Sequence, residues 1–174
     1  MNSIGLVGFP RSGKDAAAKH LAEHHGYTRI AFGDGVKSLL LAIDPIYKDS
    51  LEFLEICKNS KIKDTREKLQ NLGEVLRKYD PDFWVKTALE KIEALPEGAS
   101  VVVTDVRYQN EFDLVKQLGG ELVGIKRPGH GAVNDHVSEQ NTATLLQSAD
   151  RIVYNDGTIQ MLAQSVLGGY RVQG

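Results

Sequence analysis

Residues 8–15 have the types and the spacing of a phosphate-binding turn. Gly8 and Gly13 enclose four residues, and Lys14 follows the second glycine. Glycine lets the backbone turn tightly and approach a phosphate closely. The N–H groups of such a turn, and the positive end of a helix that follows it, then point at one anionic group. Lys14 adds a point charge for the outer phosphates of a nucleotide. The alternative is an ordinary glycine-rich turn with a solvated lysine.

Two carboxylates near this turn are candidates for Mg²⁺. Asp15 stands directly after Lys14, where the phosphate-loop pattern has a Ser or Thr whose hydroxyl contacts the metal. Asp105 ends an apolar run, where a phosphate-loop protein needs a carboxylate near the metal. Carboxylate oxygens suit a hard cation directly or through water. The alternatives are an acid in the first turn of a helix for Asp15 and a cap at the end of a strand for Asp105.

Two arginines accompany these carboxylates. Arg11 lies inside the turn, from which it can reach a transferred phosphoryl group, and Arg107 follows Asp105 by two residues. Arg107 is expected to bind phosphate or to pair with Asp105. Glu111, a little further on, has an alternative as an acid in the first turn of the next helix. Lys14, Arg11 and Arg107 are therefore the predicted catalytic residues.

One face of a predicted helix carries a second set of polar residues. Arg66, Gln70 and Arg77 recur at helical spacing on that face. Because a guanidinium group matches a phosphate bidentately, the two arginines can hold the phosphate of an acceptor. A solvated face with ion pairs to Glu67 or Glu74 explains the same spacing equally well.

Aromatic residues and histidines complete the set of candidates. Phe83 and Trp84 can stack on a base, although such a pair is more often part of a core. His130 and His136 lack the spacing of metal ligands, so no zinc site is expected.

The composition predicts one cytoplasmic domain. A chain of 174 residues can bury a sizeable core, and its 41% hydrophobic and 25% charged residues are ordinary for a globular protein. A formal net charge of −2 argues against a nucleic-acid-binding face, which needs a basic excess. The one cysteine, Cys57, excludes an internal disulfide and is expected to be buried. We find no signal peptide and no apolar run that could span a bilayer, so no membrane association is expected.

Apolar runs alternate with helical patterns along the chain. The expected strands are 3–7, 28–32, 101–105, 121–125 and 151–154. The expected helices are 16–23, 36–43, 51–58, 64–79, 82–95, 110–118 and 159–166. This order predicts an α/β fold of three layers, in which a parallel sheet of about five strands has helices on both faces. Ligands bind beyond the carboxyl ends of such strands, where Lys14, Asp105 and Asn155 all lie.

A long loop rich in glycine, histidine and charge is expected at 126–140. Loops of this length in a compact domain are often functional. Lys126 and Arg127 begin it, and Glu139 near its end is interpreted as an acid in the first turn of a helix capped by Ser138.

Several of these motifs together resemble the bacteriophage deoxynucleoside monophosphate kinases. The motifs are GFPRSGKD at 8–15, LQNLGE at 69–74, FWV at 83–85, TDVRYQNE at 104–111 and YNDGT at 154–158. The resemblance spans most of the chain. It implies a single P-loop nucleotide kinase domain at 1–174, with an acceptor-binding helical region at about 34–95 and a lid at about 126–140. It also implies Mg²⁺-dependent transfer of the γ-phosphoryl group of ATP to a deoxynucleoside monophosphate in the cytoplasm, which is the host cytoplasm if the chain is phage-encoded.

The resemblance further implies roles for individual residues. The ATP-binding residues would be Gly8, Arg11, Ser12, Gly13, Lys14, Asp15, Asn155, Gly157 and Thr158, the last three on the adenine side. The acceptor-binding residues would be Asp34, Lys37, Arg66, Gln70, Arg77, Trp84, Arg107 and Glu111. Lys126 and Arg127 would close over the site, and Asp15 and Asp105 would support Mg²⁺.

Other activities remain open at this point. Animal-type phosphomevalonate kinases are distantly similar, and the chain could also be an NTPase switch without an acceptor, or a nucleotide-binding regulator. The sequence has no Asn-Lys-x-Asp guanine motif, and it keeps Lys14, Asp105 and Arg107. The base preference, the choice between deoxyribose and ribose, and the oligomeric state, monomer or homodimer, do not follow from the sequence.

Overall fold

A five-stranded parallel sheet lies in the first of two units, in a computed structural model that describes residues 2–47, 50–60, 64–131 and 137–168. The first unit holds Met1–Ile30 and Lys91–Gly174, and the second holds Ala31–Glu90. The strands are β1 (Ser3–Val7), β2 (Tyr27–Ile30), β3 (Ser100–Val103), β4 (Glu121–Lys126) and β5 (Arg151–Tyr154), in the order β2-β3-β1-β4-β5. Every adjacent pair is parallel, so the five carboxyl ends lie at one edge. The predicted parallel sheet is confirmed.

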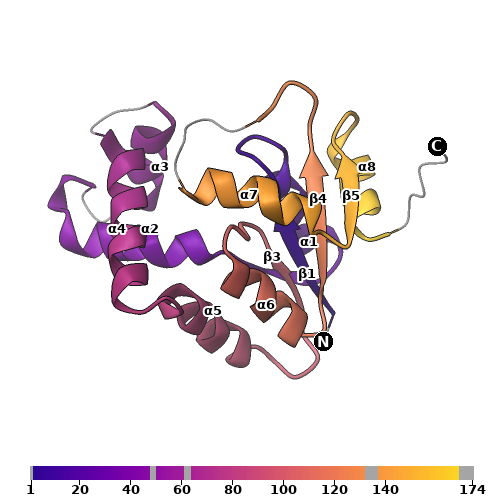
Figure 1. Cartoon of the computed structure of the whole chain (residues 1–174), viewed down its shortest axis with the longest axis horizontal. Coiled ribbons are helices and arrows are strands. Elements are labelled where there is room, and N and C mark those ends of the chain that lie inside the picture. The colour runs from indigo at the N-terminus through magenta and orange to yellow at the C-terminus, as the bar shows by residue number, and fades with distance from the viewer. Residues whose placement is uncertain (1, 48–49, 61–63, 132–136, 169–174) are drawn as a thin grey trace. The chain divides into compact units, whose positions relative to one another are not determined.

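Helices cover both faces of this sheet. On one face lie α1 (Lys14–His24) and α8 (Ile159–Val166), where Ala17, Leu21 and Leu162 share a buried cluster with strand residues. On the other face lie α6 (Gln109–Gln117) and α7 (Val137–Gln147), which stand in front of the sheet in Figure 1. This arrangement is the three-layer α/β fold that the alternating pattern predicts.

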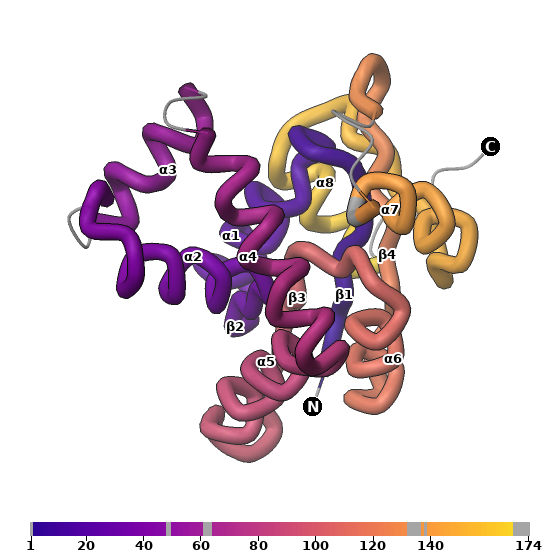
Figure 2. The backbone as a smooth tube through the Cα atoms, turned by 60° about the vertical axis from the view of Figure 1, so that its left-hand side comes forward, coloured from indigo at the N-terminus to yellow at the C-terminus, as the bar shows by residue number. Residues whose placement is uncertain are grey.

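The second unit is helical. It contains α2 (Phe32–Ile43), the 3₁₀ turn η1 (Pro45–Tyr47), α3 (Leu51–Asn59), α4 (Thr65–Tyr79) and most of α5 (Phe83–Glu93). Figure 2 shows α2, α3 and α4 side by side. Leu40, Tyr47, Leu54 and Cys57 form a buried cluster, and the Tyr47 and Thr65 hydroxyls share a hydrogen bond of 3.0 Å. The predicted burial of Cys57 is confirmed.

The chain enters α2 earlier than the sequence predicts. β2 ends at Ile30 and α2 begins at Phe32, whereas the apolar pattern predicts a strand to residue 32 and a helix only from residue 36. Glycines on either side of Asp34 suggest a turn there, but Gly35 lies against the indole of Trp84, where a Cβ would come within 2.9 Å of the ring. This glycine therefore allows close packing inside the second unit.

The loop expected at 126–140 is shorter in the structure. α7 begins at Val137, so the end of the expected loop is helical, and 132–136, with His136, lie outside the described residues. The sequence does not predict the full length of this helix from an apolar stripe, because two of its buried positions hold the polar residues Glu139 and Thr142.

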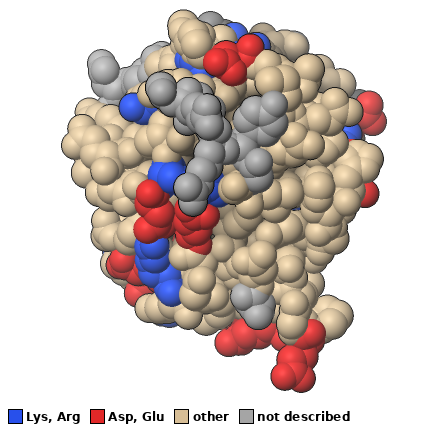
Figure 3. All heavy atoms as spheres, turned by 90° about the vertical axis from the view of Figure 1, so that its right-hand side faces the viewer, with Lys and Arg blue, Asp and Glu red and all other residues tan. Residues whose placement is uncertain are grey.

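Charged groups link β4, β5 and α8 in the first unit. Arg151 donates from Nε to the carboxylate of Glu121 over 2.6 Å, and from its other nitrogens to the carbonyls of Ser165 and Val166 at the end of α8. On the face drawn in Figure 3, blue and red atoms lie next to each other, and no broad basic area is visible among the described residues. Within the described part of the chain, no helix combines the length and the hydropathy needed to cross a membrane.

Replacing Arg151 by alanine is expected to destabilise the first unit. The variant removes the donor of two helix-terminal carbonyls and the partner of Glu121, and losing charge-assisted hydrogen bonds of this kind costs about 2 kcal/mol. The midpoint of thermal unfolding, followed by circular dichroism, should fall by roughly 4–8 °C. Lys19→Ala is the matched control, because the Lys19–Glu23 pair is exposed on both sides and such pairs contribute little. Equal midpoints for the two variants would contradict this account of Arg151.

Candidate active site

The loop between β1 and α1 has the backbone geometry of a phosphate cradle. β1 is buried along its whole length and leads the chain to the carboxyl edge of the sheet. Arg11 and Gly13 both have positive φ, 63° and 107°, and the N–H of Ser12 donates to the carbonyl of Phe9 over 3.1 Å. α1 then begins at Lys14. Its first N–H groups adjoin the loop, and the N-terminus of a helix favours an anion.

Two glycines of this loop have no room for a side chain. A Cβ on Gly13 would lie 2.4 Å from Nδ2 of Asn155. A Cβ on Gly8 would lie 2.5 Å from the carbonyl oxygen of Ile125. The glycine spacing that predicts the loop is therefore also required by its packing against β4 and against the residue that follows β5.

Lys14 reaches across the loop with a buried side chain. Its Nζ donates to the carbonyl of Phe9 over 2.9 Å. Burial first, and then the positive charge of Arg107, lower the pKa of Lys14 from 10.5 to about 8. Three carboxylates oppose this shift, those of Asp15, Asp105 and Glu139. The structure thus brings Arg107 and the two predicted carboxylates into electrostatic range of Lys14, and it adds Glu139.

Asn155, which directly follows β5, is hydrogen bonded to the phosphate loop and acts as a brace that stabilises it. Its Nδ2 donates to the carbonyl of Ser12 over 2.9 Å, and its backbone N–H donates to the carbonyl of Lys126 over 2.8 Å. Arg127 adds a longer bond, from Nη1 to the carbonyl of Arg11 over 3.3 Å. The two residues predicted for a lid, Lys126 and Arg127, are therefore connected to the phosphate loop and its brace.

The turn after β5 has structural roles that its sequence does not indicate. Thr158 caps α8 by accepting a hydrogen bond of 3.3 Å from the N–H of Met161. Gly157 packs beside the same methionine, whose Sδ lies 3.0 Å from the position of a Cβ. Contact of Asn155, Gly157 and Thr158 with adenine stays a prediction.

A cavity of about 300 Å³ adjoins the phosphate loop. Its wall includes Phe9, Ser12, Arg127, His130, Leu146 and Tyr154. Most of this wall is aromatic or aliphatic, and its rim carries a guanidinium group, as is typical of ligand cavities. Leu146 has no signal in the sequence, because it looks like an ordinary apolar helix residue and only the fold places it beside the loop.

Two backbone amides of the segment after β3 are held by a buried acid. Glu111 is 1% exposed, and its Oε2 accepts hydrogen bonds from the N–H groups of Arg107 over 2.7 Å and of Tyr108 over 3.1 Å. This is the helix-capping alternative for Glu111, and it is confirmed. Oε2 of Glu111 therefore holds the backbone after β3, and contact of Glu111 with the acceptor stays a prediction.

Glu139 is a residue of this site that sequence reasoning missed. It lies in the first turn of α7, as expected, but its side chain is 2% exposed and its Oε1 lies 3.6 Å from Nη1 of Arg107. A solvated first-turn acid would have no such neighbour. The contact joins residues far apart in the sequence, so local spacing carries no signal for it.

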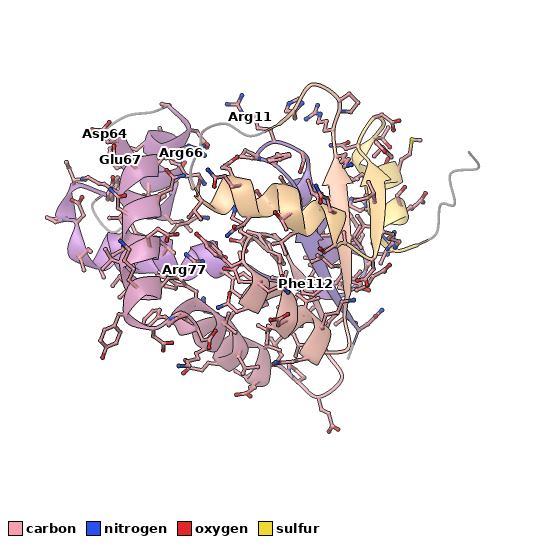
Figure 4. All side chains as sticks on the ribbon, viewed as in Figure 1. Arg11, Asp64, Arg66, Glu67, Arg77 and Phe112 are labelled. Carbon is pink, nitrogen blue, oxygen red and sulfur yellow. The ribbon has the colours of Figure 1, made fainter. Side chains whose placement is uncertain are left out.

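Arg66, Gln70 and Arg77 all lie on α4 in the second unit, and all three are partly buried. Figure 4 shows Arg66 near the beginning of the helix and Arg77 toward its other end. A helical rise of 1.5 Å per residue separates the two Cα atoms by about 16 Å. Arg77 turns back along the helix, since its Nη1 lies 3.3 Å from the Cβ position of Gly73. The two guanidinium groups can therefore bind the same phosphate only if both side chains extend toward each other along the helix.

The other acceptor candidates of the second unit have partners within it. Lys37 donates to Asp34 over 3.2 Å and pairs with Glu55 over 2.9 Å. Burial by itself lowers the pKa of Lys37, but the hydrogen bond with Glu55 and the charge of Asp34 outweigh it, and the pKa is raised. Trp84 is 2% exposed and donates from Nε1 to the carbonyl of Gly73 over 3.1 Å. The core alternative for Trp84 is confirmed, and contact of Trp84 with the acceptor stays a prediction.

The parallel sheet and the loop between β1 and α1 give the fold that is also found in solved P-loop kinases. Shikimate kinase from Aquifex aeolicus superposes with a TM-score of 0.50 at 12% identity, over 96% of this chain and 95% of that chain. Protein TT1252 from Thermus thermophilus superposes with a TM-score of 0.53 at 16% identity, over 99% of this chain and 98% of that chain. At these identities the likeness concerns the fold alone.

Comparison of the sequence with known proteins identifies the family to which this chain belongs. Residues 51–166 match the family described as deoxynucleotide monophosphate kinase. A protein of Acanthamoeba polyphaga mimivirus that carries the provisional name deoxynucleotide monophosphate kinase is 31% identical over 186 aligned positions, which cover 94% of this chain and 93% of the relative. This chain belongs to the deoxynucleotide monophosphate kinase family, in agreement with the motifs at 8–15, 69–74 and 104–111.

Proposed function

We propose that this kinase transfers the γ-phosphoryl group of ATP to the phosphate of a deoxynucleoside 5′-monophosphate, giving ADP and a deoxynucleoside diphosphate. The observation that carries the proposal is the loop between β1 and α1, with its two constrained glycines and the buried Lys14. Family membership supports the class of acceptor. The loop supports the class of donor, because it offers N–H groups and one cation to a chain of phosphates.

The chemistry needs positioning and charge neutralisation more than it needs a base. An oxygen of the acceptor phosphate forms a bond to the γ-phosphorus while the bond to the β–γ bridging oxygen breaks, and that oxygen leaves with ADP. The attacking oxygen is already anionic, so no side chain has to remove a proton. Lys14, Arg11 and Arg107 would offset the negative charge on the transferred group, which is the main protein contribution in this reaction class.

Asp15 and Asp105 would hold Mg²⁺. This ion binds through one or two carboxylates together with substrate phosphates and water. Both carboxylates lie close enough to Lys14 to oppose the lowering of its pKa. No cluster of three or more His, Cys, Asp or Glu residues suited to a metal occurs among the described residues, so ATP oxygens and water would complete the coordination. Bound there, the ion would neutralise phosphate charge.

On the acceptor side, we assign Arg66 and Arg77 to phosphate binding and Gln70 to hydrogen bonding with the nucleotide. Asp34 and Lys37 would also contact the acceptor, and to do so they must keep or exchange the ion pairs that Lys37 makes with Asp34 and Glu55. Lys126 and Arg127 would help to exclude water from the transferred group, which limits hydrolysis of ATP.

The proposal is tested by ADP release from ATP in the presence of Mg²⁺ and a panel of acceptors. The panel contains each deoxynucleoside monophosphate, each ribonucleoside monophosphate, phosphomevalonate and a control without acceptor. Release that depends on one or more deoxynucleoside monophosphates is expected. Equal release without acceptor would identify an NTPase, and release with phosphomevalonate alone would move the chain to another branch of P-loop kinases.

The lowered pKa of Lys14 predicts a basic limit to ATP use. With a pKa of about 8, the ammonium group is half charged near that pH, becomes more fully charged as the pH falls and loses its proton as the pH rises. Since kcat/KM reports the ionisation of the free enzyme, kcat/KM for ATP should fall as the pH rises from about 7.5 to about 9.5. In Lys14→Arg the guanidinium group stays charged over this range, so kcat/KM for ATP should not fall with rising pH, even if the activity is low. A flat profile for the unmodified protein would contradict the prediction.

A further inference from the structure

A buried acid accompanies the cations of the phosphate site. The side chain of Glu139 is 2% exposed, and an ionised carboxylate in such a position is costly unless a cation compensates it. Nη1 of Arg107 lies 3.6 Å from its Oε1, and Lys14 lies within range of its charge. Two cations that the proposed reaction uses are therefore neighbours of one acid that no motif indicates.

Arg107 is constrained at two points by two different buried glutamates. Glu111 accepts a hydrogen bond from its backbone N–H over 2.7 Å, which fixes the main chain after β3. Glu139 approaches the guanidinium group at the far end of the same side chain. An arginine side chain has about 2 kcal/mol of rotamer entropy to lose when it is held by a ligand. Contacts that order it beforehand reduce that cost at the moment of reaction.

We propose that Glu139 is a positioning residue for Arg107, and that it holds the guanidinium group in the orientation that meets the transferred phosphoryl group. The inference rests on the proposed function, in which Arg107 contacts that group. Glu139 itself touches no substrate. A guanidinium group has five N–H donors in a planar fork, so a carboxylate on one edge is compatible with a phosphate on another.

The main alternative to the positioning role is that Glu139 is a ligand of Mg²⁺. The described residues include no group of three or more metal-binding side chains, so Glu139 does not complete a site with Asp15 and Asp105. A carboxylate that faces a guanidinium group at 3.6 Å also has its charge compensated already. The geometry favours the positioning role, and the dependence of activity on Mg²⁺ separates the two.

The first test is Glu139→Gln, which keeps the volume and an acceptor oxygen and removes the charge. We expect kcat to fall by about 10- to 100-fold, because a misplaced catalytic group costs rate more than binding, with KM for ATP and the apparent affinity for Mg²⁺ changed less than about threefold. Glu121→Gln is the matched control. It makes the same chemical change at another glutamate–arginine pair of the same unit, that with Arg151, and should leave kcat unchanged.

The second test is a double-mutant cycle that combines Glu139→Gln with Arg107→Ala. If Glu139 acts through Arg107, Glu139→Gln should cost less than about twofold in kcat once the guanidinium is gone. Additive losses would overturn the positioning role, as would a tenfold weaker apparent affinity for Mg²⁺ in Glu139→Gln. If Glu139→Gln does not fold, Glu139→Asp, which retracts the carboxylate by one methylene, enters the same cycle under the same criteria.

The positioning role of Glu139 and the role of Arg107 in the proposed function are overturned by different results. Loss of turnover in Arg107→Ala with none in Glu139→Gln would overturn the positioning role alone and leave the proposed function in place. Full turnover in Arg107→Ala would overturn the role proposed for Arg107, and the inference about Glu139 with it.

Discussion

Lys14→Ala is expected to lower kcat for phosphoryl transfer by about 10³-fold, because it removes a buried charge that the proposed mechanism places at the transferred group. The side chain is buried and hydrogen bonded to the loop, so the ammonium group has a fixed place beside the proposed phosphate site. The fold should survive, since the pKa of Lys14 is lowered first by its burial, which is a sign that the charge is held at a cost.

The control for Lys14→Ala is Lys19→Ala in the same helix. Lys19 makes one exposed pair with Glu23, so its loss should leave turnover unchanged. Circular dichroism and thermal unfolding of both variants show whether the fold is retained. Turnover in Lys14→Ala within about tenfold of the unmodified protein would contradict the role given to the loop.

Gly13→Ala is expected to abolish detectable ATP binding at millimolar concentration. The new Cβ would lie 2.4 Å from Nδ2 of Asn155, and the φ of 107° is unfavourable for alanine. Either the loop moves or the hydrogen bond from Asn155 to Ser12 breaks, and both change the N–H groups that hold the phosphates. Binding measured by isothermal titration calorimetry gives the answer without any need for turnover.

Gly26→Ala is the matched control for this substitution. Gly26 also has a positive φ, of 70°, but nothing lies within 4 Å of its Cβ position. It therefore places an alanine at a positive φ without the steric contact, and its ATP affinity should equal that of the unmodified protein. Loss of binding in both variants would point to general strain, and retained binding in Gly13→Ala would contradict the close packing of the loop.

Local patterns predicted the parts of this protein that depend on neighbouring residues. Each of these patterns lies within a few consecutive residues. They are the glycine spacing at 8–13, the apolar runs of the strands and the turn before Ile159, and they predict β1, α1 and α8. The pattern predicts a helix only over 36–43, whereas α2 begins at Phe32, because Gly33 and Gly35 resemble turn residues and the packing of Gly35 against Trp84 has no local signal.

The remainder of the site depends on contacts between distant segments. Asn155 and Ser12 are separated by 143 positions, so no window of sequence connects the brace to the loop. The pairing of Glu139 with Arg107 and the burial of Trp84 are of the same kind. Glu111 was assigned to the acceptor by resemblance, whereas its carboxylate binds two backbone N–H groups, a use that side-chain chemistry alone does not distinguish from substrate binding.

The most direct test of the central claim follows the label of γ-³²P ATP into product. With Mg²⁺ and a deoxynucleoside monophosphate as acceptor, the account predicts that the unmodified protein forms labelled deoxynucleoside diphosphate with little free phosphate, and that Lys14→Ala forms almost none. Label that appears only as inorganic phosphate, whatever the acceptor, would contradict the account, because it would mean that water and not a nucleotide receives the phosphoryl group.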